Sequence, residues 1–164
     1  MIISLDAKMK LTDIDLTMKT KIGMLFLLLA ALIAISTALA HLSCIYLGAE
    51  CYAAQMAPQQ IIDSAIKGTY LAPIGTLFAS ATFVMMGLYA LSGAGIIRQL
   101  PLTKYTIYTI ATLSIIRGIL PLQLWVRHPE RVSDLVLTIG IVWLVAGLLY
   151  LLGYRCCANA RLAH

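Results

Sequence analysis

The chain contains four continuous apolar runs, each bounded by charged or polar residues. A helix that crosses a bilayer needs about 20 apolar residues, and every run reaches that length. Backbone groups inside a bilayer must satisfy their own hydrogen bonds, which a continuous apolar run achieves as a helix. The runs cover approximately residues 22–46, 70–97, 105–126 and 135–154.

This pattern predicts an all-α polytopic membrane protein, a bundle of four transmembrane helices. Of the 164 residues, 61% are hydrophobic and 12% are charged, which leaves little sequence for a soluble domain. We expect a cytoplasmic N-terminal arm over residues 1–21, a membrane domain over residues 22–154 and a cytoplasmic tail over residues 155–164.

Lysine and arginine are distributed unequally among the segments between the runs. The arm carries four cations, and the second loop and the tail carry two each, eight in all, against three in the first and third loops. The positive-inside rule then places both termini in the cytoplasm. The net charge of +5 follows from this asymmetry. Since no basic stripe with interleaved aromatic residues is present, we expect no nucleic-acid partner.

The first apolar run also resembles a secretion signal, because Ala38–Ala40 before His41 fits a signal-peptidase site. Two features oppose cleavage there. The preceding arm is long and contains aspartates, and the apolar run continues through Leu42–Leu47. We therefore expect the run to stay as an uncleaved membrane anchor.

The first outer loop, Gly48–Thr69, contains a short amphipathic segment. Pro58 suits the first turn of a helix, and Gly68 suits its end. The segment predicts a helix that lies along the membrane surface and either caps the bundle or covers a site. Its expected apolar face consists of Ile61, Ile62, Ala65 and Ile66, and its expected polar face of Gln59, Gln60, Asp63, Ser64 and Lys67.

Small residues recur at helical spacing in the second and fourth runs. Such residues let helix backbones approach closely in lipid, where packing replaces the hydrophobic effect. We interpret them as packing features rather than as a ligand groove. They are Gly75, Ala79, Gly87, Ala90 and Ala94 in the second run, and Gly140 and Gly147 in the fourth.

Arg117 is the strongest candidate for a functional side chain. It lies 13 residues after Lys104 and 10 before Arg127, near the centre of the third run. An arginine at that depth costs on the order of 3 kcal/mol, so we expect it to face the interior and to have a partner. Pro121 has no amide proton, and it therefore frees the carbonyl of Arg117. A site for an anion or head group and a structural role are equally open.

Three other residues can join Arg117 in a buried polar cluster. His41 lies near the outer end of the first run, Glu50 follows that run, and Asp134 precedes the fourth. A carboxylate can bind a guanidinium in a bidentate pair. His41 is otherwise a hydrogen-bonded core histidine. We assign no catalytic residue, metal site or cofactor, and the lack of a second histidine within a run argues against haem.

The four cysteines form two pairs of different character. Cys156 and Cys157 are adjacent and cytoplasmic, and neighbouring cysteines rarely form an unstrained disulfide. Cys44 and Cys51 lie at the oxidising outer face. On a continuous helix they stand about 10 Å apart, too far to bond. If the helix ends at Gly48, they can form a structural disulfide.

The outer pair resembles in topology the quinone-linked disulfide oxidases of the bacterial inner membrane. That resemblance implies a thiol–disulfide oxidoreductase with four helices and cytoplasmic termini. Two departures weaken it. The first pair of that family is a CxxC motif, whereas Cys44 and Cys51 are seven residues apart, and residues 127–134 contain no cysteine for the second pair.

A second resemblance covers about residues 25–154. Gly87–Gly95, followed by Arg98–Leu102, resembles a family of small proteobacterial four-helix inner-membrane proteins without an established activity. Arg117-Gly118 and a histidine near the end of the first run belong to the same likeness. This resemblance implies the four-helix fold and a location in the bacterial inner membrane, and it implies no activity.

These observations favour a non-enzymatic membrane protein that binds lipid or a small amphiphile, or that serves as an accessory subunit of another membrane protein. The few ionisable groups in the runs argue against a proton-coupled transporter. An enzyme is the alternative if His41, Glu50 and Arg117 converge in an outer pocket. The quinone-linked thiol–disulfide oxidoreductase is the second choice.

Overall fold

The computed structural model describes residues 2–162, with the side chains of 2–15, 131 and 160–162 outside the described set. These residues are helical and contain no strand, as the sequence predicts. The helices are α1 (Ile2–Leu47), α2 (Ala49–Ala54), α3 (Gln59–Ile66), α4 (Leu71–Ala94), α5 (Thr103–Arg127), the 3-10 turn η1 (Pro129–Arg131) and α6 (Asp134–Leu162).

Four of these helices are long and apolar enough to cross a bilayer, which confirms a multi-pass membrane protein. The segments are Leu16–Leu47, Leu71–Ala94, Thr103–Arg127 and Asp134–Asn159. The predicted helix in the loop between the first two spanning helices is also present as α3, preceded by Pro58 and followed by Gly68 with φ of 67°.

The helix ends differ from the predicted boundaries at three places. α4 ends at Ala94 instead of residue 97, because Gly95 adopts φ of 78° and turns the chain away. α1 includes the predicted arm from Ile2 onward, and α6 continues into the tail as far as Leu162. Neither segment contains a proline or a left-handed glycine at the predicted boundary, so the helix runs on.

The chain divides into two compact units. Ala31–Leu88 forms the first, here called the cap unit because it contains α2 and α3. Met1–Ala30 and Tyr89–His164 form the second, here called the hairpin unit because it contains α5 and α6.

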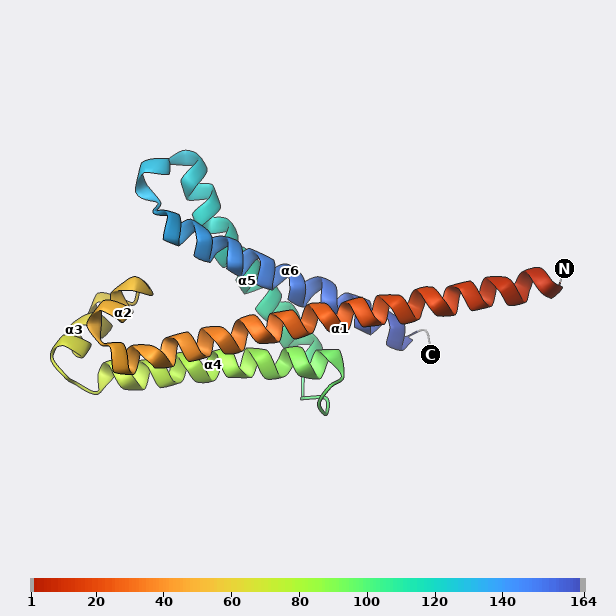
Figure 1. The fold of residues 1–164 in the computed structure, drawn as a ribbon, viewed down its shortest axis with the longest axis horizontal. Helices are drawn as coiled ribbons and strands as arrows, with labels where there is room; N and C mark the ends of the chain where they lie inside the picture. The colour runs from red at the N-terminus through yellow and green to blue at the C-terminus, as the bar shows by residue number, and fades with distance from the viewer. Residues whose placement is uncertain (1, 163–164) are drawn as a thin grey trace. The chain divides into compact units, whose positions relative to one another are not determined.

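In the hairpin unit, α5 and α6 lie side by side (Figure 1). Their closest approach is at glycines. A Cβ atom built on Gly118 would lie 2.5 Å from the backbone nitrogen of Leu144, and one on Gly147 would lie 2.9 Å from the carbonyl oxygen of Ala111. A Cβ atom built on Gly140 would lie 3.0 Å from the Pro121 ring. The expectation that Gly140 and Gly147 serve close helix packing is therefore confirmed.

Other small residues join the remaining parts of the hairpin unit. The first half of α1 packs against the end of α6 at Gly23. A Cβ atom built on Gly23 would lie 2.8 Å from the carbonyl oxygen of Gly153. The connection between α4 and α5 is organised by the fully buried Ser92. Its hydroxyl accepts from the Leu100 amide at 2.9 Å and lies 3.2 Å from the Thr103 hydroxyl.

In the cap unit, the second half of α1 runs beside α4 (Figure 1). A Cβ on Gly87 would meet the Ile35 side chain at 3.2 Å, and the buried Ser80 hydroxyl donates to the Ala38 carbonyl at 3.2 Å. Because Ala31, Ala34 and Ala38 are buried as well, the contact between the two helices is made by small side chains.

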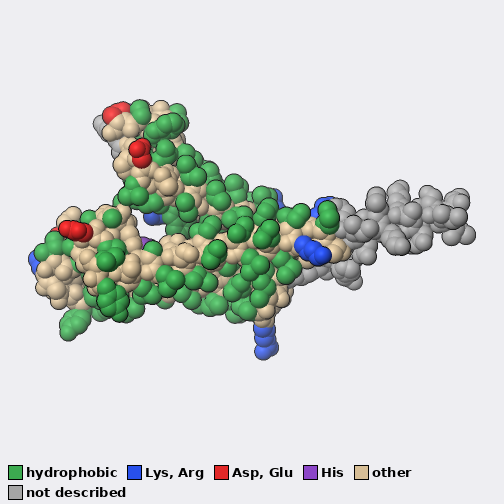
Figure 2. Space-filling view, in the orientation of Figure 1, with side chains coloured by type: hydrophobic (Ala, Val, Ile, Leu, Met, Phe, Trp, Pro, Cys, Tyr) green, Lys and Arg blue, Asp and Glu red, His purple; other side chains and the backbone are tan. Residues whose placement is uncertain are grey.

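Apolar side chains cover the outer surfaces of the helices, while acidic side chains gather at the loop ends of each unit (Figure 2). The exposed apolar residues include Leu77 and Phe78 on α4 and Leu113 and Leu120 on α5. A soluble protein would bury such residues, whereas lipid chains can contact them in a membrane.

Candidate functional site

The first helix ends at Gly48, and this break brings two cysteines together. Gly48 has φ of 78°, a left-handed conformation that glycine adopts without strain, and α2 begins immediately after it. The reversal leaves the Cα atoms of Cys44 and Cys51 only 5.2 Å apart, and the two residues form a disulfide. The condition set by the sequence, a helix end at Gly48, is met in the structure.

The disulfide forms part of a compact core beneath α2 and α3. Cys44, Tyr52 and Ala72 are buried there, and Ile61, Ile62 and Ala65 of α3 pack against them. The Gln55 side-chain amide donates to the Ala40 carbonyl at 2.7 Å, which ties the end of α2 back to α1.

Ser64 connects α3 to the start of α4. Its hydroxyl accepts from the Ala72 amide at 2.8 Å and lies 2.7 Å from the Thr69 hydroxyl. Amides in the first turn of a helix have no acceptor within the helix, so a side chain from outside supplies one here. The expected faces of α3 are therefore wrong at two positions, since Ser64 is 4% exposed and Ile66 is 69% exposed.

A second polar contact joins α2 to α4. The Tyr52 hydroxyl oxygen lies 2.9 Å from the Thr76 hydroxyl, and Thr76 also donates to the Ala72 carbonyl at 2.8 Å. Both side chains are buried, so this contact fixes the position of the Tyr52 ring.

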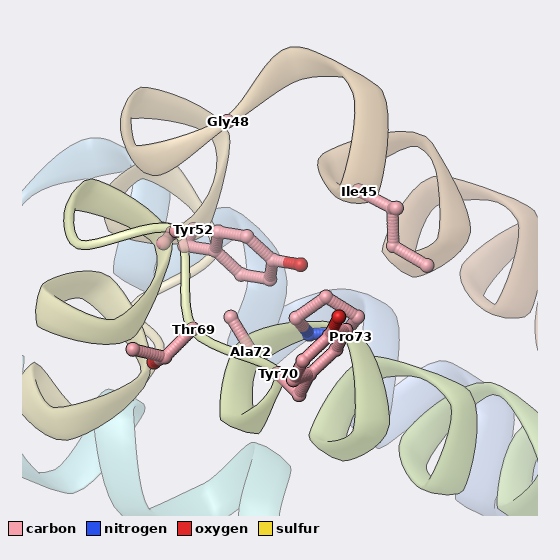
Figure 3. A pocket seen from close by; sticks show the side chains of 9 residues that line it. Ile45, Gly48, Tyr52, Thr69, Tyr70, Ala72 and Pro73 are labelled. Carbon is pink, nitrogen blue, oxygen red and sulfur yellow. The ribbon is translucent and has the colours of Figure 1, made fainter.

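These contacts surround a pocket with a volume of about 230 Å³. Figure 3 shows the Tyr52 ring projecting between Ile45, near the end of α1, and the Tyr70–Pro73 segment that begins α4. Most of the lining is apolar. The complete lining is Ile45, Gly48, Tyr52, Ala65, Gly68, Thr69, Tyr70, Ala72 and Pro73.

Two of the predicted site residues lie in the cap unit but do not line this pocket. The His41 ring stacks on the Phe83 ring, with centroids 5.1 Å apart and planes 9° apart. Glu50 lies in the first turn of α2 and is exposed. The stacked, half-buried His41 is consistent with a packing role, because one face of its ring is occupied by Phe83.

The other two predicted site residues lie in the hairpin unit, and they are separated along it. Gly118 faces Leu144, so Asp134 lies ten residues, about 15 Å, further along α6 than the level of Arg117. This separation exceeds the reach of an arginine side chain. The predicted cluster of Arg117, His41, Glu50 and Asp134 is not assembled within either unit.

Arg117 itself is exposed, and its guanidinium carbon lies 5.7 Å from the centre of the Trp143 ring. Whether it faces the interior of the four-helix bundle stays a prediction, but the side chain does not lie between α5 and α6. The physical reason is the closeness of α5 and α6, since the backbone contact at Gly118 and Leu144 leaves no space for a long side chain between them. The guanidinium instead uses the face of an indole ring.

The sequence reasoning missed Tyr52, Ser64 and Thr76. One signal was available, because Ala72, Thr76 and Ser80 follow at intervals of four and so share a helix face with small residues. A hydroxyl within such a face marks a buried polar contact. No comparable pattern predicts that Tyr52 is buried, because the helix break at Gly48 determines its position.

The fold and the pocket define an α-helical multi-pass membrane protein with a disulfide-closed cap. No protein-family model, curated protein or solved structure matches this chain. The resemblance to small proteobacterial inner-membrane proteins accordingly stays an expectation.

Proposed function

We propose that the protein is a non-enzymatic inner-membrane protein that binds a lipid or another small amphiphile in the pocket of the cap unit. The observation that carries this proposal is the pocket itself, about 230 Å³ with a largely apolar lining. An apolar cavity of about 150 Å³ is enough to hold benzene. The pocket therefore has room for part of an acyl chain or a small apolar ring.

The few polar groups at the pocket support an amphiphile rather than a pure hydrocarbon. Three residues with hydroxyl groups, Tyr52, Thr69 and Tyr70, belong to its lining. Binding sites for small molecules commonly combine an apolar lining with a few hydroxyls that orient the ligand. The apolar part of a ligand would then lie against Ile45 and Pro73.

Filling the pocket should remove the ligand. In Ile45→Trp, the indole would occupy the space between α1 and Pro73, and we expect bound lipid or amphiphile to fall by about tenfold, the effect of losing roughly 1.4 kcal/mol of binding. Ala65→Leu should act in the same direction from the α3 side. Native mass spectrometry of protein purified in mild detergent measures the bound fraction.

Tyr46→Trp is the matched control for this experiment. Tyr46 adjoins Ile45 in sequence but is 92% exposed, so the same indole should leave the bound fraction unchanged. Equal ligand loss in Tyr46→Trp, or full retention in both filling variants, would contradict the proposed site.

The orientation in the membrane is a separate part of the proposal. Four crossings would put both termini on the same side, and the excess of eight cations over three supports the cytoplasmic side. Reporter fusions at Gln99 and after His164 should score cytoplasmic, while fusions at Gln60 and Pro129 should score external. An external C-terminus would overturn this orientation.

The second candidate is a quinone-linked thiol–disulfide oxidoreductase. The observation that favours it is the disulfide between Cys44 and Cys51, since Gly48 between them lines the pocket. Such a relay needs a second cysteine pair on the same side, and the loop between α5 and α6 has none. Reduction of added quinone on supplying a reduced dithiol protein would promote this candidate.

A further inference from the structure

The disulfide and the pocket of the cap unit are built from the same short stretch of chain. Gly48 lies between the two bonded cysteines, Tyr52 directly follows Cys51, and both Gly48 and Tyr52 line the pocket (Figure 3). Cys44 is buried in one core with Tyr52 and Ala72, and these two residues belong to the pocket lining. The state of the disulfide therefore bears directly on the shape of the pocket.

α2 carries Tyr52 and depends on the rest of the cap unit for its position. It has six residues and no side-chain cap, and a helix this short is not stable in water by itself. The disulfide at Cys51 and the hydrogen bond from Gln55 to the Ala40 carbonyl at 2.7 Å join α2 to α1. The contact of the Tyr52 hydroxyl with Thr76 at 2.9 Å joins it to α4. Because a hydrogen bond contributes only a modest net stabilisation, the covalent bond is the strongest of these connections.

We propose that the disulfide is a redox switch for the pocket, which holds the amphiphile while Cys44 and Cys51 are bonded and releases it when they are reduced. This inference rests on the proposed binding of an amphiphile in the cap unit. After reduction, only hydrogen bonds and packing hold α2 in place. Tyr52 then leaves the pocket wall in a larger fraction of the molecules, and the apparent affinity falls with the fraction that keeps a formed pocket.

The switching reaction is a thiol–disulfide exchange with a dithiol, either a small molecule or a protein with two neighbouring thiols. Cys44 is fully buried in the cap core and Cys51 is only partly buried, so the first thiolate of the dithiol attacks the Cys51 sulfur. The bond to Cys44 breaks, and Cys44 leaves as a thiolate that takes up a proton. The second thiolate of the dithiol then attacks the mixed disulfide and releases Cys51, which is protonated in turn. The protein gains two electrons and two protons, and the dithiol becomes a disulfide.

Saturable photolabelling of the purified full-length protein by a diazirine-bearing fatty acid tests the switch. The apparent dissociation constant is measured for the oxidised protein, after reduction with dithiothreitol, and after removal of dithiothreitol and reoxidation. We expect it to rise by about tenfold on reduction, as when about one molecule in ten keeps a formed pocket, and to return on reoxidation. Alkylation followed by mass spectrometry verifies the state of Cys44 and Cys51 in each sample.

Two variants are the matched controls. Cys44→Ala combined with Cys51→Ala should bind like the reduced protein and should not respond to dithiothreitol. Cys156→Ser removes a free cysteine of the hairpin unit and should respond to dithiothreitol as the unmodified chain does. Hydrogen exchange of the ligand-free protein gives a second measurement, in which reduction should speed exchange in α2 by about fivefold or more and leave α5 unchanged.

Equal affinity in the oxidised and reduced protein would overturn the switch and leave the proposed function intact. A loss of affinity that does not return on reoxidation, or a response to dithiothreitol in the variant without Cys44 and Cys51, would overturn it as well. Unchanged exchange of α2 on reduction would have the same consequence. Labelling of the oxidised protein that is not saturable would instead contradict the proposed function, and the switch with it.

Discussion

Gly118→Leu should lower the free energy of unfolding by about 2–3 kcal/mol, the cost of overpacking a close contact. The contact is between backbones, since even a Cβ atom at Gly118 would lie 2.5 Å from the nitrogen and 2.7 Å from the Cα of Leu144. No side-chain rotation can relieve it, so α5 and α6 must move apart. Equilibrium unfolding in mixed detergent micelles measures the loss.

A smaller substitution at two glycines provides the control. Gly118→Ala should still destabilise the protein, although alanine favours a helix by about 1 kcal/mol over glycine. Gly75→Ala should be neutral or stabilising, because its Cβ would meet only the flexible tip of Ile61 at 3.3 Å. If both alanine substitutions change the free energy of unfolding by the same amount, the close approach of α5 and α6 at Gly118 would be contradicted.

Removing the disulfide by Cys44→Ser with Cys51→Ser should destabilise the cap unit by about 2–3 kcal/mol, as expected from the entropy of so short a closed loop. The loop spans a sequence separation of 7 and includes Gly48, so the chain between the helices regains freedom in the unfolded state. We expect faster hydrogen exchange in α2 and a weakened pocket, because Tyr52 lies on α2.

Cys156→Ser is the control for this experiment, since Cys156 is a free cysteine in the hairpin unit. It should leave the exchange of α2 unchanged. Thiol labelling of the unfolded protein should modify two cysteines before reduction and four after it. Four reactive thiols before reduction would contradict the disulfide-closed cap.

The membrane-spanning helices and α3 could be predicted from the sequence because their signals are local. A continuous apolar run fixes a spanning helix by length, and Pro58 and Gly68 mark the ends of α3 by backbone chemistry alone. Gly48 is a local signal of the same kind, because the disulfide between Cys44 and Cys51 was predicted to form if the first helix ended there.

The errors arose where a contact between distant residues decides the outcome. Ser64 is buried because the Ala72 amide, eight residues later, needs an acceptor, and helical periodicity carries no information about that need. Within the hairpin unit, Arg117 lies outside the contact between α5 and α6, because the backbone approach of Gly118 to Leu144 determines their register. The expected pairing with Asp134 ignored that register.

Photolabelling with a diazirine-bearing fatty acid tests the central claim, binding of an amphiphile in the pocket, most directly. The protein is irradiated in membranes with increasing unlabelled competitor, and the labelled peptides are mapped. The account predicts saturable labelling confined to peptides around Ile45–Tyr52 and Ala65–Pro73, lost in Ile45→Trp and retained in Tyr46→Trp. Labelling that is not saturable, and that spreads over the exposed apolar surfaces of α4, α5 and α6, would contradict it.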